Sequence, residues 1–218
     1  MAKKAPRKLD LQPKRLGSDK LLKALNAQVG NEMHASMQYV AIAAHFDAEN
    51  LPRLAAFFYR QADEERAHSM KFVRHIVDLG GHLAMPAIAA PKATFASAAE
   101  AVALSLKWEH TVTGQIYDLV DIAKGDRNYI SMRFLDWFVS EQLEEINSME
   151  TLLAIVERAG EDNLLLVEDY IAPNAIGDGG GGPTREMIEN IAELEQHPGA
   201  PRVRYGTVRE FMERIERE

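Results

Sequence analysis

Cysteine is absent from this sequence of 218 residues. Disulfides, thiolate zinc sites, cysteine-ligated iron–sulfur clusters and cysteine nucleophiles are therefore excluded, and nothing in the sequence calls for an oxidising compartment. Any metal that the chain binds must be held by oxygen and nitrogen ligands.

Long hydrophobic runs are also missing. No stretch approaches the roughly 20 consecutive apolar residues that span a bilayer. The positively charged start has no apolar segment behind it of the kind that a secretory signal needs. We therefore expect a cytoplasmic protein with no membrane partner.

The charges are unevenly distributed. Among the first fifteen residues only Asp10 is acidic, and six are basic: Lys3, Lys4, Arg7, Lys8, Lys14 and Arg15. Taking these from the 25 basic and 33 acidic residues of the whole chain leaves a net charge of −13 for the rest. The sequence thus predicts a basic arm over residues 1–17 on a strongly acidic body.

The body has the periodicity of helices almost throughout. Ser18 is a suitable N-cap for the first helix, and Pro52 stands where a second helix can begin. The four long helices are expected at about 18–50, 52–80, 97–124 and 127–159. Short turns join the first two and the last two, whereas residues 81–96 form a longer link. This pattern predicts an all-α four-helix bundle with one long crossover.

Further elements follow the fourth helix. A short fifth helix is expected at 162–171, which closes the bundle domain at residue 172. Residues 173–218 then form an extension that begins with a glycine-rich linker, Gly177 to Pro183. Two amphipathic segments follow the linker, at 184–197 and 207–218.

Each long helix carries a glutamate near the middle of its expected buried face: Glu32, Glu65, Glu109 and Glu145. The fourth buried stripe is expected to run through Ile130, Phe134, Phe138, Glu141, Glu145, Ser148, Leu152 and Ile155. A single glutamate in a helix usually faces solvent, but four on core stripes need compensating positive charge. With His68 one turn after Glu65, a pair of metal ions supplies it. Oxygen-rich ligation suits iron or manganese, and zinc could also occupy such a site.

Several segments resemble the ferroxidase motifs of bacterial non-haem ferritins. They are Asn31–Tyr39 (NEMHASMQY), Glu64–His68 (EERAH), Lys107–Glu109 (KWE) and Phe134–Glu145 (FLDWFVSEQLEE), and the likeness covers about residues 21–171 in order. A glutamate together with a Glu-x-x-His motif is the general pattern of ferritin-like carboxylate sites.

The resemblance implies a role for each matching residue. Glu32, Glu65 and His68 correspond to ligands of a first iron, with Glu65 bridging to a second. Glu109 and Glu145 correspond to ligands of the second iron, with Gln142 beside it. A third, weaker iron position is matched by Glu64, Glu141 and Glu144. Tyr39 resembles the family's tyrosine near the first iron, an electron donor, although a core tyrosine with a satisfied hydroxyl is the alternative.

Two departures narrow the resemblance. Glu145 is followed by Ile146, Asn147 and Ser148, so a second Glu-x-x-His is missing, which argues against bacterioferritins and di-iron oxygenases. Arg66 stands where bacterioferritins carry the methionine that binds an intersubunit haem. We therefore expect no haem.

The resemblance implies an iron-storage protein with ferroxidase activity. Such a protein oxidises Fe(II) with O2 at a di-iron centre within each subunit and deposits ferric mineral inside a shell of twenty-four identical subunits. Two other functions remain open. In the first, the ends of the chain carry the function: the basic arm could bind DNA by neutralising phosphates, or the extension after Gly177 could dock a partner. The second is a di-iron oxygenase that acts on an organic substrate.

Overall fold

The computed structural model describes residues 15–171 of the chain. Its elements are α1 (Asp19–Ala48), α2 (Pro52–Asp78), α3 (Ala98–Gly125), α4 (Tyr129–Ala159), a 3₁₀ turn η1 (Glu161–Asn163) and α5 (Leu164–Ile171). The expected all-α bundle with a short fifth helix is confirmed. The basic arm up to residue 14 and the extension from residue 172 lie outside the described residues.

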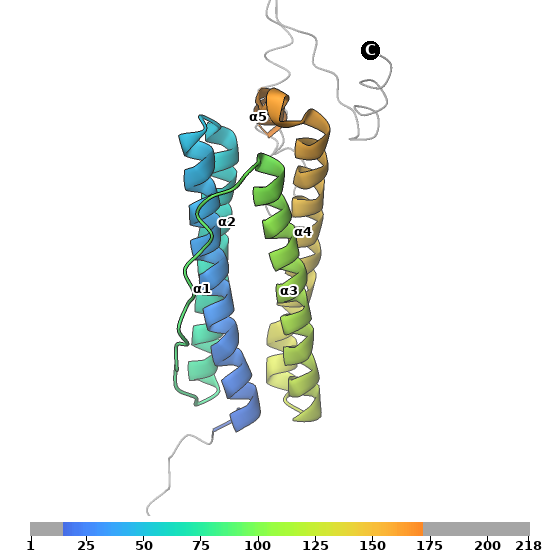
Figure 1. Ribbon diagram of the computed structural model, residues 1–218. Helices are drawn as coiled ribbons and strands as arrows, with labels where there is room; N and C mark the ends of the chain where they lie inside the picture. The colour runs from blue at the N-terminus through green and yellow to red at the C-terminus, as the bar shows by residue number, and fades with distance from the viewer. Residues whose placement is uncertain (1–14, 172–218) are drawn as a thin grey trace, which may run out of the picture.

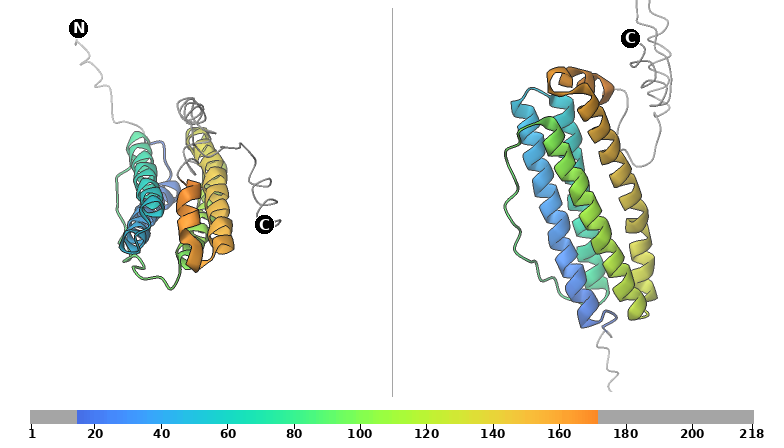
Figure 2. Two further views of the ribbon diagram at one scale, coloured as in Figure 1. Left: turned by 90° about the horizontal axis from the view of Figure 1, so that it is seen from above. Right: turned by 45° about the vertical axis from the view of Figure 1, so that its right-hand side comes forward.

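The four long helices form two antiparallel hairpins that lie side by side (Figure 1). Helices α1 and α2 make one hairpin, and α3 and α4 make the other. The crossover between them, residues 79–97, runs along the length of α1 and brings the chain back to the opposite end of the bundle (Figure 2). At that end α5 lies across the bundle. The predicted topology with one long crossover is therefore correct.

Local sequence signals set the ends of the long helices. Ser18, Ser97 and Asn128 each accept a hydrogen bond of 3.0 Å from the backbone N–H three residues later, and so cap α1, α3 and α4. Pro52 is the first residue of α2, where it has no N–H to leave unsatisfied. Helix α4 begins two residues later than expected because Arg127 has a positive φ of 54° and Asn128 is the cap.

The N-terminus of α2 is capped by a residue of α5, more than a hundred positions later in the sequence. Its own N-cap residue, Leu51, makes no side-chain capping bond. The carboxylate of Glu168 on α5 instead accepts hydrogen bonds from the backbone N–H of Arg53, at 2.9 and 3.1 Å, and from that of Leu54, at 2.8 Å. Negative charge at a helix N-terminus is favourable, so this contact stabilises α2 and holds α5 in place.

Two side-chain amides of α1 hold the crossover against this helix through hydrogen bonds to the backbone of the crossover. Asn26 accepts from the backbone N–H of Ala84 at 2.6 Å and donates to the carbonyl of His82 at 3.2 Å. Gln38 pairs with both backbone groups of Lys92 at 2.9 Å. Each amide therefore replaces hydrogen bonds that the irregular backbone cannot make within a helix or sheet.

Gly30 allows the crossover to approach α1 closely. A Cβ atom at this position would lie 2.2 Å from Cγ of Pro86. Real Cβ atoms do not approach a neighbour so closely, so the proline ring occupies the space that a side chain would need.

The hydrophobic core consists of two clusters separated along the bundle axis. The cluster nearer to α5 includes Tyr39, Phe46, Phe58 and Leu152. The other cluster includes Leu25, Phe72, Ile116 and Phe138. In every long helix, the core glutamate lies between the residues of these two clusters in sequence. The fold thus places one polar layer between two well-packed apolar regions.

The expected buried stripe of α4 is partly wrong. Ile130 was expected in the core but is 56% exposed, and Ser131 is buried in its place. The buried stripe then runs through Leu135, Phe138, Gln142, Glu145, Met149, Leu152 and Val156. Phe138, Glu145 and Leu152 are therefore buried as expected, and every other expected position of the stripe is shifted by one residue toward the C-terminus. Among residues 15–171, no helix combines the length and the apolarity needed to cross a membrane.

Candidate metal centre

Four glutamates, one from each long helix, meet in the polar layer. Glu32 of α1 and Glu65 of α2 are each 1% exposed, Glu109 of α3 is fully buried, and Glu145 of α4 is 6% exposed. The predicted burial of all four side chains is confirmed. Charged side chains are rarely buried to this degree without partners, so the layer needs a physical explanation.

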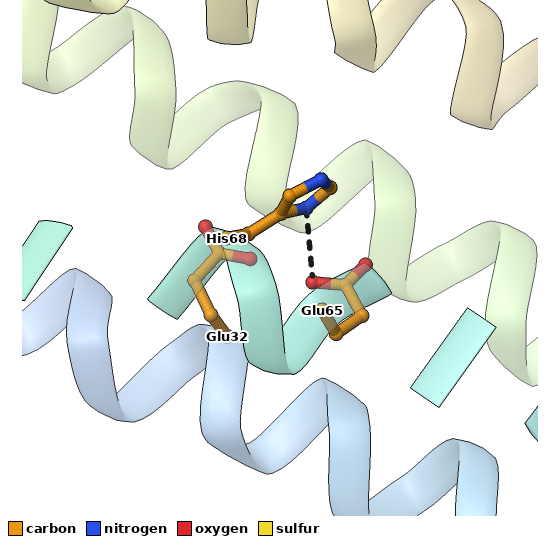
Figure 3. Close-up of side chains that lie close together, drawn as sticks. All are labelled: Glu32, Glu65 and His68. Carbon is orange, nitrogen blue, oxygen red and sulfur yellow. Dashed lines mark ion pairs between the residues drawn. The ribbon is translucent and has the colours of Figure 1, made fainter. Parts of the chain in front are cut away.

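The carboxylates form two groups that could each hold a metal ion. Glu32, Glu65 and His68 form the first group, and Glu65, Glu109 and Glu145 form the second. Within each group, one oxygen or nitrogen atom from every residue lies within 4.8 Å of the others. Figure 3 shows the first group, with Glu32 projecting from α1 toward Glu65 and His68 on α2. Because Glu65 belongs to both groups, it lies where a bridging carboxylate would be needed.

His68 connects this pair of groups to a third one. Its Nδ1 atom is 3.6 Å from Oε2 of Glu65 and 3.9 Å from Oε1 of Glu145, and its Nε2 atom is 3.7 Å from Oε1 of Glu141. The third group consists of His68, Glu141 and Glu145. Of the three residues expected at the third iron position, only Glu141 falls in one of these groups. Glu144 is exposed, and Glu64 accepts a hydrogen bond from Gln61.

Several carboxylate oxygens of the layer have no hydrogen-bond partner among the described residues. They are Oε2 of Glu32, both oxygens of Glu65 and Oε2 of Glu109. Leaving a buried charged group without partners costs several kcal/mol. One cation bound in each of the two groups that share Glu65 would supply the missing positive charge to all three residues.

Burial shifts the pKa values of the layer strongly. Burial is the largest cause that raises the pKa of Glu32, Glu65, Glu109 and Glu145, and repulsion between neighbouring carboxylates raises those of Glu65 and Glu145 further. The pKa of Glu109 rises to about 8. Burial, helped by the charge of Lys71, lowers the pKa of His68 to about 4. The imidazole is therefore neutral at pH 7 and offers a nitrogen lone pair to a cation.

The hydroxyl of Tyr39 contacts Glu109. Tyr39 is fully buried and donates a hydrogen bond to Oε1 of Glu109. Sequence reasoning expected this tyrosine near the first metal, whereas its hydrogen bond is to a carboxylate of the second group. The nearby amide of Gln142 is 3% exposed, and its Oε1 atom accepts a bond of 2.9 Å from the hydroxyl of Thr113.

Sequence reasoning missed three polar residues that support the layer. Gln28 donates to Oε1 of Glu32 at 2.8 Å. Asn31 donates to Oε1 of Gln28 at 3.1 Å and to Oε1 of Gln115 at 2.9 Å, and so ties α1 to α3. The spacing of four residues between Gln28 and Glu32 is a signal that could have identified the first contact. The contact between Asn31 and Gln115 depends on which helices are neighbours. The contact between Thr113 and Gln142 depends on this too.

Lys71 lies at the edge of the layer. Its Nζ atom is 3.0 Å from the ring centroid of Trp137, and that ring stands edge-on to His68 with a centroid separation of 5.3 Å. The ammonium group also lowers the pKa of Glu141, although burial has the larger effect and raises it. Cationic charge is thus present beside Glu141, outside the two groups that share Glu65.

Comparison with known proteins agrees with this architecture. The model of the ferritin-like domain family matches residues 22–159. The chain is 40% identical over 148 residues to ferritin BfrB of Mycobacterium tuberculosis (strain ATCC 35801 / TMC 107 / Erdman), covering 68% of this chain and 81% of that protein. It is 41% identical over 146 residues to the bacterial non-heme ferritin of Staphylococcus aureus (strain USA300), covering 67% and 88%.

Solved structures give the same result. An open-pore ferritin of the hyperthermophilic archaeon Archaeoglobus fulgidus superimposes with a TM-score of 0.69 at 29% sequence identity, covering 71% of this chain and 96% of that chain. The fold and the carboxylate layer define a protein of the ferritin-like class. The chain belongs to the ferritin family, whose members store iron.

Proposed function

We propose that this iron-storage chain is a ferroxidase, which binds two Fe(II) ions in the glutamate layer and oxidises them with O2. The observation that carries the proposal is the position of Glu65. It is shared by two ligand groups, is 1% exposed, and has both oxygens without hydrogen-bond partners among the described residues. A bridging carboxylate between two cations accounts for all three properties.

Each iron takes its ligands from different helices. The first is held by Glu32 and His68, the second by Glu109 and Glu145, and Glu65 bridges the two. Mostly anionic oxygen ligands favour Fe(III) over Fe(II), so the site lowers the cost of oxidation. Each iron gives up one electron, and a pair therefore supplies the two electrons that take O2 to the level of peroxide.

Gln142 is proposed as an additional ligand of the second iron. A third, weaker position uses Glu141 with Glu64 and Glu144, at the edge of the layer where Lys71 also lies. Its partly exposed carboxylates suit iron on its way into or out of the di-iron pair. Tyr39 is proposed to supply a further electron to the oxygen that the irons have reduced, because its hydroxyl is bonded to Glu109, whose carboxylate can take up the phenolic proton.

Storage requires an enclosed space for the oxidised iron. We propose that the chain forms a homo-oligomer, a hollow shell of twenty-four subunits as the family implies, with an acidic inner surface that attracts Fe(II) and starts mineral growth. The expected absence of haem and the cytoplasmic location stay predictions. A role of the basic arm in binding DNA, or of the extension in docking a partner, also stays a prediction, because both lie outside the described residues.

The decisive experiment measures the iron that stays in solution per chain after excess Fe(II) is added in air. Wild type is compared with Glu65→Gln and with Asp63→Asn, an acid-to-amide change at an exposed position of the same helix. We expect wild type and Asp63→Asn to retain far more iron than the two or three ions that the ligand groups can hold. We expect Glu65→Gln to oxidise Fe(II) much more slowly.

The possible outcomes separate the parts of the proposal. Retention that stops at two or three irons per chain would mean that the layer binds iron without a storage cavity, and the oxygenase or partner-binding readings would then gain support. Equal oxidation rates for wild type and Glu65→Gln would refute the role of the bridging carboxylate.

A further inference from the structure

The hydroxyl of Thr113 lies between two oxygen atoms that both accept hydrogen bonds. Its Oγ1 atom is 2.8 Å from the backbone carbonyl oxygen of Glu109 and 2.9 Å from Oε1 of Gln142. A hydroxyl group has only one proton to donate, so it can satisfy only one of these two acceptors at a time. Two hydrogen-bond patterns of similar quality are therefore available around the same atom.

In the first pattern the Thr113 hydroxyl donates to Oε1 of Gln142. The NH2 group of the amide is then directed away from Thr113, and the amide lies close enough to Glu109 to lower the pKa of that carboxylate. Gln142 is 3% exposed, and a buried amide must find its partners within the protein. This pattern suits a layer without cations, where Glu109 needs a donor.

In the second pattern the Thr113 hydroxyl donates to the carbonyl oxygen of Glu109. Its own oxygen then accepts from the NH2 group of Gln142, and the planar amide is turned by half a rotation. The two ends of an amide have similar size, so this rotation needs no movement of the helices. The carbonyl oxygen of Gln142 then takes the place of the NH2 group and faces the second ligand group.

We propose that Thr113 is a hydrogen-bond switch that turns the amide of Gln142 from donor to metal ligand when a second cation binds. The proposal rests on the two-cation function proposed above. A cation between Glu109 and Glu145 repels the NH2 group and attracts the carbonyl oxygen, a ligand that hard cations favour. The hydroxyl stabilises both orientations of the amide, because it can donate a hydrogen bond to the carbonyl oxygen of Gln142 or accept one from its NH2 group. Thr113 is thus a positioning residue that acts through Gln142.

A bond from a threonine hydroxyl to the carbonyl four residues earlier is common in helices and does not by itself indicate a function. Thr111, on the same helix, makes such a bond to the carbonyl of Lys107 at 2.9 Å, and its side chain is exposed. Thr113 differs in having the amide oxygen of Gln142 as a second acceptor, on another helix. Thr111 is therefore a matched control for the backbone bond alone.

The test uses titration of the metal-free full-length chain with Co2+, followed by calorimetry and by the visible absorption of bound Co2+. The variants are Thr113→Val, which keeps the shape and removes the hydroxyl, Thr113→Ser, which keeps the hydroxyl, and Thr111→Val. Loss of a residue that orients a metal ligand typically weakens metal binding by about 10- to 100-fold. We expect Thr113→Val to weaken the second Co2+ by about tenfold and to alter its absorption, with the first Co2+ unchanged.

The controls decide how the result is read. Thr113→Ser and Thr111→Val should bind both ions like wild type, and Thr113→Ala should repeat the loss if the valine variant folds poorly. Unchanged binding by Thr113→Val and Thr113→Ala, or an equal loss at both positions, would overturn the switch while leaving the two-cation site in place. Wild type that binds fewer than two Co2+ per chain would instead overturn the two-cation site, and the switch with it.

Discussion

Replacing Glu109 with glutamine should stabilise the metal-free protein, although it removes a proposed ligand. The pKa of this carboxyl is raised from 4.5 to about 8 in the folded chain. The native state therefore holds the proton more tightly than the unfolded state, and stability falls as pH rises from 4.5 through 8. At pH 7 most of this loss has occurred, and linkage puts it at about 3 kcal/mol, against about 1 kcal/mol at pH 5.

Glutamine has no such proton to lose. Its carbonyl oxygen can still accept the hydrogen bond of Tyr39, and its NH2 group would lie among the oxygens of Glu65 and Glu145, which share a ligand group with Glu109. We expect Glu109→Gln to raise the melting temperature of the metal-free protein at pH 7 by about 6–12 °C, since 1 kcal/mol corresponds to about 2–4 °C for a chain of this size.

The assay is thermal unfolding of chelator-treated protein at equal subunit concentration, because oligomers have concentration-dependent stability. Glu150→Gln, at an exposed position of α4, should change the stability by less than about 0.5 kcal/mol. With metal added, the order should reverse, because wild type binds the cation more tightly. A destabilised Glu109→Gln variant, or a gain that is as large at pH 5 as at pH 7, would refute the reasoning.

Three further predictions test the cap of α2, the packing of the crossover against α1, and metal binding by the glutamate layer. Glu168→Ala removes the cap of α2 and should cost about 1.5–3 kcal/mol, with faster hydrogen exchange at the amides of Arg53 and Leu54; unchanged exchange there would contradict the capping role. Gly30→Ala should destabilise by about 1–3 kcal/mol in thermal unfolding by displacing the crossover, whereas Gly114→Ala, with nothing within 4 Å, should be neutral or stabilising. Zn2+ titrations of wild type should show weaker binding at pH 6 than at pH 8, because protons compete for carboxylates of raised pKa; affinity independent of pH would contradict this.

The positions of the four core glutamates could be predicted from the sequence because they follow from counting. A helix repeats every 3.6 residues, so an acidic residue in register with apolar neighbours falls on the buried face. The same counting failed at Ile130. There the buried position belongs to Ser131, whose hydroxyl is 2.9 Å from Nε2 of His75, a buried histidine that stacks on Phe134. This partner belongs to a neighbouring helix, so counting along α4 alone could not show that the buried positions there are shifted by one residue.

Contacts between residues far apart in the sequence could not be predicted in this way. Glu168 caps α2 from more than a hundred residues away, and nothing near it in the sequence indicates that role. Thr113 and Asn31 are polar residues whose positions in their helices do not set them apart. Their contribution depends on which side chains face them across the bundle, and so on the packing of the whole domain.

The arrangement of the core explains how such a costly layer can persist. Four buried carboxylates with raised pKa values destabilise the metal-free fold, and this cost falls on the middle of the bundle. The two apolar clusters on either side contain fully buried aromatic side chains, including Phe58 and Phe72, and these hold the four helices at fixed spacing. The helices therefore cannot spread apart to hydrate the carboxylates. The remaining way to relieve the repulsion is to bind protons or cations, and at neutral pH a divalent metal does so most effectively, because each ion neutralises two charges. The same packing that stabilises the fold thus favours metal binding by the glutamate layer.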